Sequence, residues 1–438
     1  MQGTDRMAVE PPLLVQESSL LKIKLAADRN PEMAFTSLAH KIDLHLLKRS
    51  YKELNKGKSS GVDKVTASEY GEDLDQNLFN LHKRLVEGKY RALPVKRIWI
   101  DKEDGNKRPI GITALEDKIV QKAVSILLEL IYDVTFHNFS YAFRPNCSQH
   151  MAIHQIREHC YSSKVKWIVS ADITGLFDNI DHKLLINIIR ERITDSSIIK
   201  LIGKWLKAGV FENDSISYSD KGTPQGGVIS PILSNIFLHH VLDDWLVHSV
   251  SEKMKGKCFV IRYADDFILG FESLEDARKV VEVLPARFGK YGLELHPEKT
   301  KMIPFGKPKK DHSGKGLSTF DFLGFTFYWG KSLKGYWIIK KKTIGKRLRR
   351  SLSRMWNWCK ENRHMNVSKQ FHLLSDKLMG YYQYYGVRGN YESLDKAFQF
   401  LYRAWRYWLN MRGGEKIVSF KELKNRYPLP RPRIVQNI

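Results

Sequence analysis

The chain has 438 residues, 42% of them hydrophobic, which is enough for more than one domain with a packed core. Its 72 Lys and Arg against 48 Asp and Glu give a net charge of +24, and this excess favours a polyanionic partner. The four cysteines are scattered without a Cys-x-x-Cys pair, which argues against a zinc site or a disulfide framework. There is no apolar run of membrane-spanning length and no signal-peptide pattern, so we expect a cytoplasmic protein with no membrane partner.

The first strong chemical signal along the chain is a carboxylate at the end of a strand. The apolar, β-branched run 166–173 predicts a strand that ends on Asp172, and Asp181 then begins a helical pattern. An Asp at the end of an apolar strand is costly to bury unpaired, so we expect it to meet a metal ion or another cation.

A second signal is the tetrapeptide Tyr263-Ala264-Asp265-Asp266, which lies between two apolar runs. This pattern predicts a strand, a tight turn and a second strand, with two adjacent carboxylates at the bend. An isolated Asp pair is more often only a good turn former. Together with Asp172, however, it gives three carboxylates on two strand ends. This set suits a two-Mg²⁺ phosphoryl-transfer site, because Mg²⁺ takes oxygen ligands that substrate phosphates complete.

The C-terminal third is basic and helical. Residues 331–360 contain eleven Lys or Arg and no acidic residue, and Trp337, Trp356 and Trp358 are interleaved with them. Basic and aromatic side chains together suit nucleic-acid binding, although a charge run alone is usually a solvated face. Residues 341–412 show three helical patterns, and a tail with regularly spaced prolines follows.

These motifs, in this order, resemble the bacterial group II intron reverse transcriptase/maturase family over roughly residues 35–410. Any one motif is weak, whereas the ordered set is specific. The segments that carry the resemblance are 97–102, 107–112, 117–121, 141–145, Asp172 with Phe177, 222–231, 263–266, 293–300, 322–325 and 378–385.

The resemblance implies an α+β fold, the right-hand polymerase, with an antiparallel palm sheet and an all-α thumb called maturase domain X. The expected domains are an N-terminal extension (1–35), fingers (36–165), palm (166–330), thumb (341–412) and a short tail (413–438). We expect that tail to be too short for the DNA-binding and HNH endonuclease domains that many relatives append.

The resemblance also implies RNA-directed DNA polymerase activity in a bacterial, nucleic-acid-associated protein. Asp172, Asp265 and Asp266 would be the catalytic, metal-binding residues, with the backbone carbonyl of Ile173 as a further ligand. They would hold two Mg²⁺ ions, for which Mn²⁺ could substitute. The expected partners are an RNA template, a DNA or RNA primer, deoxynucleoside triphosphates and a group II intron RNA.

Further roles follow from the matched positions. Those expected to contact the incoming nucleotide are Lys102, Arg108, Phe177, Gln225 and Lys299, and Phe177 would block a ribose 2′-hydroxyl. Asp101 departs from the family, which usually has Pro before the fingers lysine. The positions expected to contact nucleic acid are Arg144, Lys346, Arg347, Arg349 and Arg350.

Three functional readings stay open. The first is an intron-encoded reverse transcriptase that also aids splicing, and the second is a free-standing relative used in repair or defence. The third, an RNA-binding maturase without polymerase activity, is disfavoured because every metal and triphosphate position is intact. An RNA polymerase with a similar palm is a more distant rival, which Phe177 and the fingers and thumb motifs oppose.

Overall fold

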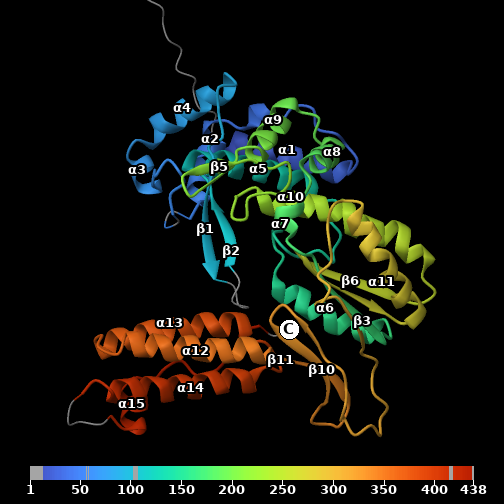
Figure 1. Cartoon of the computed structure of the whole chain (residues 1–438), viewed down its shortest axis with the longest axis vertical. Coiled ribbons are helices and arrows are strands. Elements are labelled where there is room, and N and C mark those ends of the chain that lie inside the picture. The colour runs from blue at the N-terminus through green and yellow to red at the C-terminus, as the bar shows by residue number, and fades with distance from the viewer. Residues whose placement is uncertain (1–12, 56, 58, 102–106, 414–417, 437–438) are drawn as a thin grey trace, which may run out of the picture. The chain divides into compact units, whose positions relative to one another are not determined.

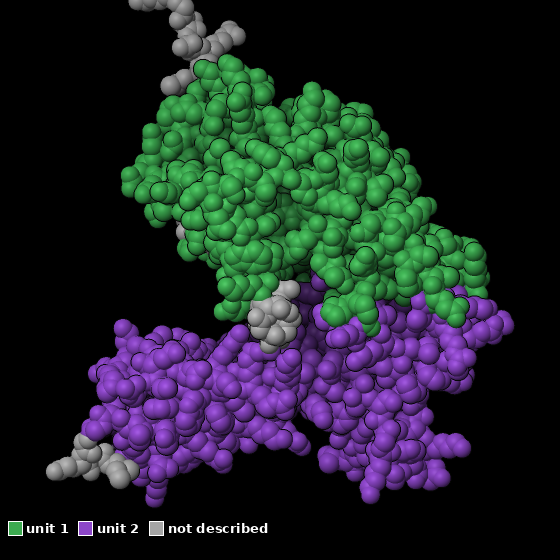
Figure 2. All heavy atoms as spheres, viewed as in Figure 1, with its two compact units in different colours: residues 1–147, 172–253, 282–297 green, residues 148–171, 254–281, 298–438 purple. Residues whose placement is uncertain are grey.

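The computed structural model describes residues 13–55, 57, 59–101, 107–413 and 418–436. The chain forms two compact units, shown in green and purple in Figure 2. Unit 1 comprises residues 1–147, 172–253 and 282–297, and unit 2 comprises residues 148–171, 254–281 and 298–438. Each unit is therefore built from three separate stretches of sequence.

Unit 1 is mainly helical (Figure 1). Its longest buried helix is α5 (Leu115–Tyr132), in which Ile119, Val120 and Ala123 are fully buried. The other helices are α1 (Leu13–Arg29), α2 (Leu44–Glu53), α3 (Ala67–Glu72), α4 (Leu74–Val86), α7 (Leu176–Asn179), α8 (His182–Arg190), α9 (Ser196–Leu206) and α10 (Ser230–Leu238). Short 3-10 or π-helical turns follow at η1 (Ala39–Lys41), η2 (His239–Asp243), η3 (Leu246–Val250) and η4 (Ser251–Lys253).

Unit 1 also contains a four-stranded sheet in the order β2-β1-β4-β5. Strand β1 (Val95–Asp101) pairs antiparallel with β2 (Lys107–Ile112) and parallel with β4 (Val210–Glu212), which in turn pairs antiparallel with β5 (Ser215–Ser217). Glu212 fixes the hairpin to β4, because its carboxylate accepts a hydrogen bond from Trp99 Nε1 at 2.6 Å.

Unit 2 begins with α6 (Gln149–Ser162) and a sheet in the order β6-β7-β3-β8. The strands are β3 (Trp167–Asp172), β6 (Cys258–Tyr263), β7 (Asp266–Phe271) and β8 (Lys301–Pro304). Helix α6 packs against this sheet through His159, whose ring stacks on Phe259 at a centroid separation of 5.1 Å. Helix α11 (Leu274–Gly289) follows β7.

A second sheet of unit 2, in the order β11-β10-β9, leads into a helical bundle. Its strands are β9 (Phe320–Phe322), β10 (Phe325–Lys331) and β11 (Trp337–Thr343). The helices are α12 (Gly345–Glu361), α13 (Val367–Tyr385), α14 (Tyr391–Asn410) and the short α15 (Phe420–Arg426). The prediction of three helices within 341–412 is confirmed by α12, α13 and α14.

The apolar periodicity read from the sequence accounts for the core of this bundle. Leu374, Leu378 and Tyr382 are fully buried on α13, and Leu401 and Trp405 are fully buried on α14. Positions three and four apart lie on one face of a helix, so these faces meet in a shared core.

The proline-containing tail docks on the same bundle. The Leu429 N–H donates to the Tyr402 hydroxyl at 2.6 Å, and the Tyr382 hydroxyl donates to the Pro430 carbonyl at 3.1 Å. Leu429 is 3% exposed. The described part of the tail therefore contacts the protein itself.

Within the part of the chain that the structure describes, every helix is too short or too polar to cross a bilayer.

Candidate active site

The Tyr263–Asp266 motif forms the predicted hairpin. Strands β6 and β7 pair antiparallel up to Tyr263 and Asp266, so Ala264 and Asp265 make a two-residue turn. Ala264 takes a left-handed conformation (φ +58°), which costs a non-glycine residue about 1–2 kcal/mol. The fully buried Arg262 lies at this turn, and its guanidinium donates to the Ala264 carbonyl at 3.4 Å. Such strain is found at sites where the surrounding structure fixes the backbone.

The first sequence-predicted aspartate, Asp172, is the last residue of β3. Strand β3 is the neighbour of β7, and the Lys166 N–H, just before β3, donates to the Phe271 carbonyl at the end of β7 at 2.9 Å. The two strands therefore run antiparallel.

The backbone after Asp172 is oriented by a bridge between Ile173 and Leu295. Its two hydrogen bonds are made by the flanking residues: the His296 N–H donates to the Asp172 carbonyl and the Thr174 N–H donates to the Glu294 carbonyl, each at 2.8 Å. In this type of antiparallel pair the central carbonyl, that of Ile173, points to the opposite side. The side chains of Asp172, Asp265 and Asp266 are each half-buried, and carboxylate and carbonyl oxygens are ligand types that fit Mg²⁺.

A second group of predicted residues meets within unit 1, around the Gly222–Pro231 loop. The Thr223 N–H donates to the Phe177 carbonyl at 2.6 Å, and the Gly222 N–H donates to the Ile180 carbonyl at 2.8 Å. The loop is therefore fastened to the segment that carries Phe177, whose side chain is half-buried.

The glycine pair at 226–227 lets the backbone of this loop come close to a neighbouring segment. Gly226 has φ +107°, and a Cβ there would lie 2.7 Å from the Gly111 carbonyl oxygen of β2. The close approach is thus to the β1–β2 hairpin, and the Gly111 N–H donates to the Gln225 carbonyl at 2.5 Å.

The side chains of Arg108, Gln225 and Asp178 form a hydrogen-bonded chain. Arg108 Nε donates to Gln225 Oε1 at 2.9 Å, and Gln225 Nε2 donates to Asp178 Oδ2 at 2.8 Å. The two partners together fix which way the amide faces. A cavity of about 340 Å³ beside them is lined by Asp178, Gln225 and Arg97 among others. The sequence reasoning did not select Asp178, although its position directly after Phe177 was a usable signal.

For two lysines that were predicted to bind the nucleotide, the structure adds little about their role. Lys102 lies outside the described residues. Lys299 lies on an exposed turn of unit 2, before β8. Their roles remain predictions.

Arg144, predicted to contact nucleic acid, holds a loop of unit 1 together. Its guanidinium is hydrogen-bonded to the Asp133 carboxylate at 2.7 Å and to the carbonyls of His137 and Ser140 at 2.8 Å each. Its side chain is 9% exposed. Most of its donors are therefore used within the chain, and these contacts favour a structural role.

The four predicted basic residues of α12 divide into two groups. Arg349 and Arg350 lie three and four positions after Lys346, so all three share one face of the helix. The Arg347 side chain instead hydrogen-bonds Tyr384, whose hydroxyl donates to the Leu323 carbonyl at 3.0 Å. Arg347 thus helps to hold α12, α13 and the turn before β10 together.

A second basic surface in unit 2 surrounds Lys341, on the inward face of β11. A cavity of about 360 Å³ is lined there by Arg157, Lys340, Lys341, Lys342, Arg388, Glu392 and Lys396 among others. Lys341 is 7% exposed. Burial and the neighbouring Arg157 lower the pKa of Lys341 to about 8.

The lowered pKa of Lys341 predicts a pH-dependent stability. Below pH 8 the Lys341 ammonium is charged in both the folded and the unfolded state, and its burial opposes folding. Above pH 10.5, the ordinary pKa of lysine, the amine is neutral in both states and this cost has vanished. Replacing Lys341 by Met should therefore stabilise the protein at pH 7 by about 1–3 kcal/mol. The gain over wild type should shrink between pH 8 and 10.5. Thermal unfolding across this range is the measurement, and the exposed Lys342→Met is the control. A gain that does not change with pH would contradict the assignment.

This chain is similar in sequence to several known proteins. The profile of the family described as "Reverse transcriptase (RNA-dependent DNA polymerase)" matches residues 100–327, just over half of the chain. YkfC of Escherichia coli K12 is 34% identical over 278 residues, which cover 55% of this chain and 71% of YkfC.

Two similar proteins carry intron names. The group II intron-encoded protein LtrA of Lactococcus lactis subsp. cremoris is 37% identical over 227 residues, covering 51% of this chain and 37% of LtrA. The putative COX1/OXI3 intron 2 protein of Saccharomyces cerevisiae is 31% identical over 279 residues, covering 63% of this chain and 30% of that protein. The chain thus matches about a third of each of these longer proteins.

The matched domain implies the right-hand polymerase fold, and its members are RNA-directed DNA polymerases that use divalent metal ions. The chain belongs to the reverse transcriptase family, among the group II intron reverse transcriptases and maturases.

Proposed function

We propose that this protein copies RNA into DNA by adding deoxynucleotides to a primer 3′-hydroxyl at a two-Mg²⁺ site formed by Asp172, Asp265 and Asp266. The observation that carries the proposal is the strained turn at 264–265, which presents Asp265 and Asp266 side by side in unit 2. Bound Mg²⁺ supplies a lowered pKa for the 3′-hydroxyl and charge neutralisation on the leaving pyrophosphate.

The chain's own residues would do the positioning. The three carboxylates and the Ile173 carbonyl supply hard oxygen ligands, while the tight hairpin keeps Asp265 and Asp266 adjacent. Arg108 supplies positive charge for a triphosphate, and its bond to Gln225 holds the guanidinium in place before a nucleotide arrives. Lys102 and Lys299 are proposed to add charge to the same triphosphate.

Primer extension by the full chain tests this proposal. With an RNA template, an annealed DNA primer, four deoxynucleoside triphosphates and Mg²⁺, we expect products that reach the template end. Chelation should stop synthesis, and excess Mg²⁺ or Mn²⁺ should restore it. Failure to extend any primer on RNA under these conditions would contradict the proposal.

Phe177 gives a prediction about sugar choice. If its half-buried ring packs under the 2′ position, Phe177→Ala should raise ribonucleotide incorporation relative to deoxyribonucleotide by roughly 10- to 100-fold, because a steric block is removed. Competitive single-nucleotide addition measures the ratio. Phe400→Ala, which truncates a half-buried ring on α14, is the control. Equal ratios in wild type and Phe177→Ala would make Phe177 an ordinary packing residue.

We further propose that the protein binds intron RNA and assists splicing, since two of its relatives are named as intron proteins. The free-standing alternative shares every catalytic residue. A folded group II intron core in the DNA around the gene, whose RNA binds the protein and splices faster with it, would support the intron role. Flanking DNA without such a core would favour the free-standing enzyme.

A further inference from the structure

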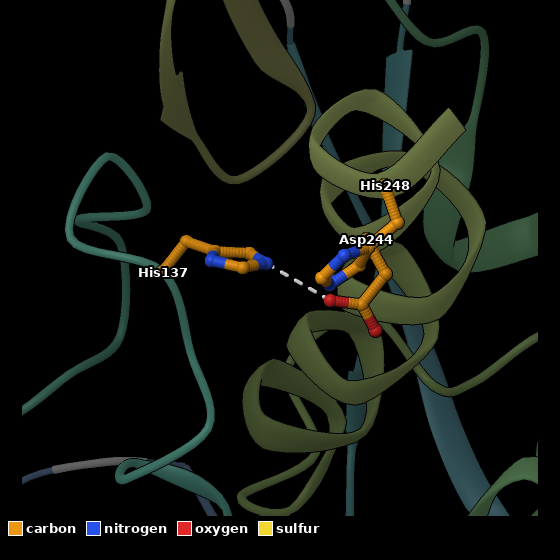
Figure 3. A group of neighbouring side chains, drawn as sticks. All are labelled: His137, Asp244 and His248. Atoms are coloured by element: carbon orange, nitrogen blue, oxygen red, sulfur yellow. Dashed lines mark hydrogen bonds and ion pairs between the residues drawn. The ribbon is translucent and has the colours of Figure 1, made fainter. Parts of the chain in front are cut away.

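Two histidines and an aspartate gather in unit 1 on residues that the proposed polymerase chemistry does not use. His137 lies on the loop after α5, while Asp244 and His248 lie on the helical segment that continues α10 (Figure 3). His137 Nε2 is 2.9 Å from Asp244 Oδ1. One ligand atom from each of the three residues lies within 4.8 Å of the others.

The local fold explains why these side chains converge. Asp244 and His248 are four residues apart, which places them on one face of a helix. The segment around them contains the π-helical turns η2 and η3, a distortion that often marks functional sites. Across from it, the His137 carbonyl accepts a hydrogen bond from Arg144 at 2.8 Å, and the His137 ring stacks on Phe139. The Arg144 clamp therefore holds the histidine against the helix.

The spacing is close to that of a transition-metal site. In a tetrahedral zinc site, bonds of about 2.0–2.1 Å place the ligand atoms roughly 3.4 Å apart. The distances in the cluster bracket this value, so small side-chain rotations are enough to bring the three atoms onto one ion. A fourth position could be filled by water or by His239, whose Nε2 is 3.5 Å from Asp244 Oδ2. A cavity of about 430 Å³ borders the cluster and gives room for such a ligand.

The charged residues around the cluster also affect how favourably it would bind a cation. Glu32 and Glu191 line the same cavity, and their negative charges favour cation binding. Arg192 also lines the cavity, and its positive charge opposes cation binding. Imidazole donors favour Zn²⁺ and related transition metals over Mg²⁺. The scattered cysteines argued against a zinc site in the sequence, but a His–His–Asp site requires no cysteine.

We propose that His137, Asp244 and His248 form a binding site for Zn²⁺ or a similar transition-metal ion, separate from the polymerase site. The ion would join the loop after α5 to the helix that follows α10. The occupied site should therefore stabilise the folded protein through binding linkage.

Titration of the full, tag-free chain with Zn²⁺ after chelator treatment tests this inference. We expect His248→Ala and Asp244→Asn each to lose one zinc equivalent, or to weaken it by at least about tenfold. His248 is exposed, so its replacement should leave the fold intact. His364→Ala, an exposed histidine in unit 2, should retain wild-type stoichiometry. Unchanged zinc binding in both cluster variants, or no tight zinc in wild type, would reduce the cluster to a His–Asp hydrogen bond.

Two further measurements separate this site from the catalytic one. X-ray absorption of the one-zinc protein should show only nitrogen and oxygen neighbours at about 2.0–2.1 Å. Zn²⁺ should raise the unfolding temperature of wild type and Asp265→Asn alike, but not of His248→Ala. A sulfur neighbour, or an equal temperature rise in His248→Ala, would overturn the assignment. Neither measurement depends on primer extension. A failure of the zinc proposal can therefore be told apart from a failure of the polymerase proposal.

Discussion

Replacing Asp265 by Asn should abolish primer extension while leaving nucleic-acid binding nearly unchanged. The substitution keeps the shape of the turn residue but removes one negative charge from the proposed metal site. Because metal ions supply several kcal/mol of charge stabilisation, we expect the rate of nucleotide addition to fall on the order of 10³-fold or more. Asp172→Asn should behave in the same way. Affinity for template–primer depends instead on distributed phosphate contacts.

Single-turnover extension and filter binding on the same preparations measure the two effects. Asp311→Asn removes the same charge from an exposed loop of unit 2 and serves as the control. Substantial synthesis by Asp265→Asn with Mg²⁺ as the only divalent ion would remove Asp265 from the metal site. A parallel loss of RNA binding would instead indicate a folding defect.

The second large effect is expected at the basic face of α12. Replacing Lys346, Arg349 and Arg350 by Gln should weaken binding to template–primer and to structured RNA by roughly tenfold or more, with little dependence on sequence. Each lost phosphate contact should lower the slope of log affinity against log salt by about one. Processivity should fall more than the rate of a single addition, because Arg108 and Gln225 are untouched.

Binding over a salt series, with extension on a long template, measures these changes. A matched variant replaces Lys309, Lys310 and Lys315 by Gln, which removes three charges from an exposed loop of the same unit. Equal losses in both variants would mean that net charge alone drives binding. An unchanged slope with unchanged processivity in the α12 variant would mean that this face is only exposed to solvent and does not bind nucleic acid.

Arg347→Gln should lower the stability of the protein as well, because Arg347 contacts Tyr384.

Local patterns in the sequence predicted those parts of the structure that depend on neighbouring residues. The Ala264–Asp265 turn follows from two short apolar runs around a tight bend, and the burial of Leu374, Leu378 and Tyr382 follows from helical spacing. In both cases the pattern and the fold it specifies lie within one stretch of chain. The expected domain limits and the individual site roles remain predictions.

Contacts between side chains that are far apart in the sequence could not be predicted from such local patterns. The Gln225–Asp178 hydrogen bond joins residues 47 positions apart, and the His137–Asp244 pair spans 107. Arg144 lies in a family motif, yet its partners are mostly backbone carbonyls, which no composition rule identifies. The docking of Leu429 under the Tyr402 hydroxyl likewise depends on where the helices place that hydroxyl. These features become visible only when the folded chain brings the partners together.

The central claim is that Asp172, Asp265 and Asp266 jointly hold the ions that drive DNA synthesis on RNA. The most direct test is an experimental structure of the full chain with an RNA template, a chain-terminated DNA primer, the incoming deoxynucleoside triphosphate and Mg²⁺. We predict two ions held by Asp172, Asp265 and Asp266, with the Ile173 carbonyl on one of them and the triphosphate near Arg108. Ions bound to other side chains, or a triphosphate remote from the turn at 264–265, would contradict it.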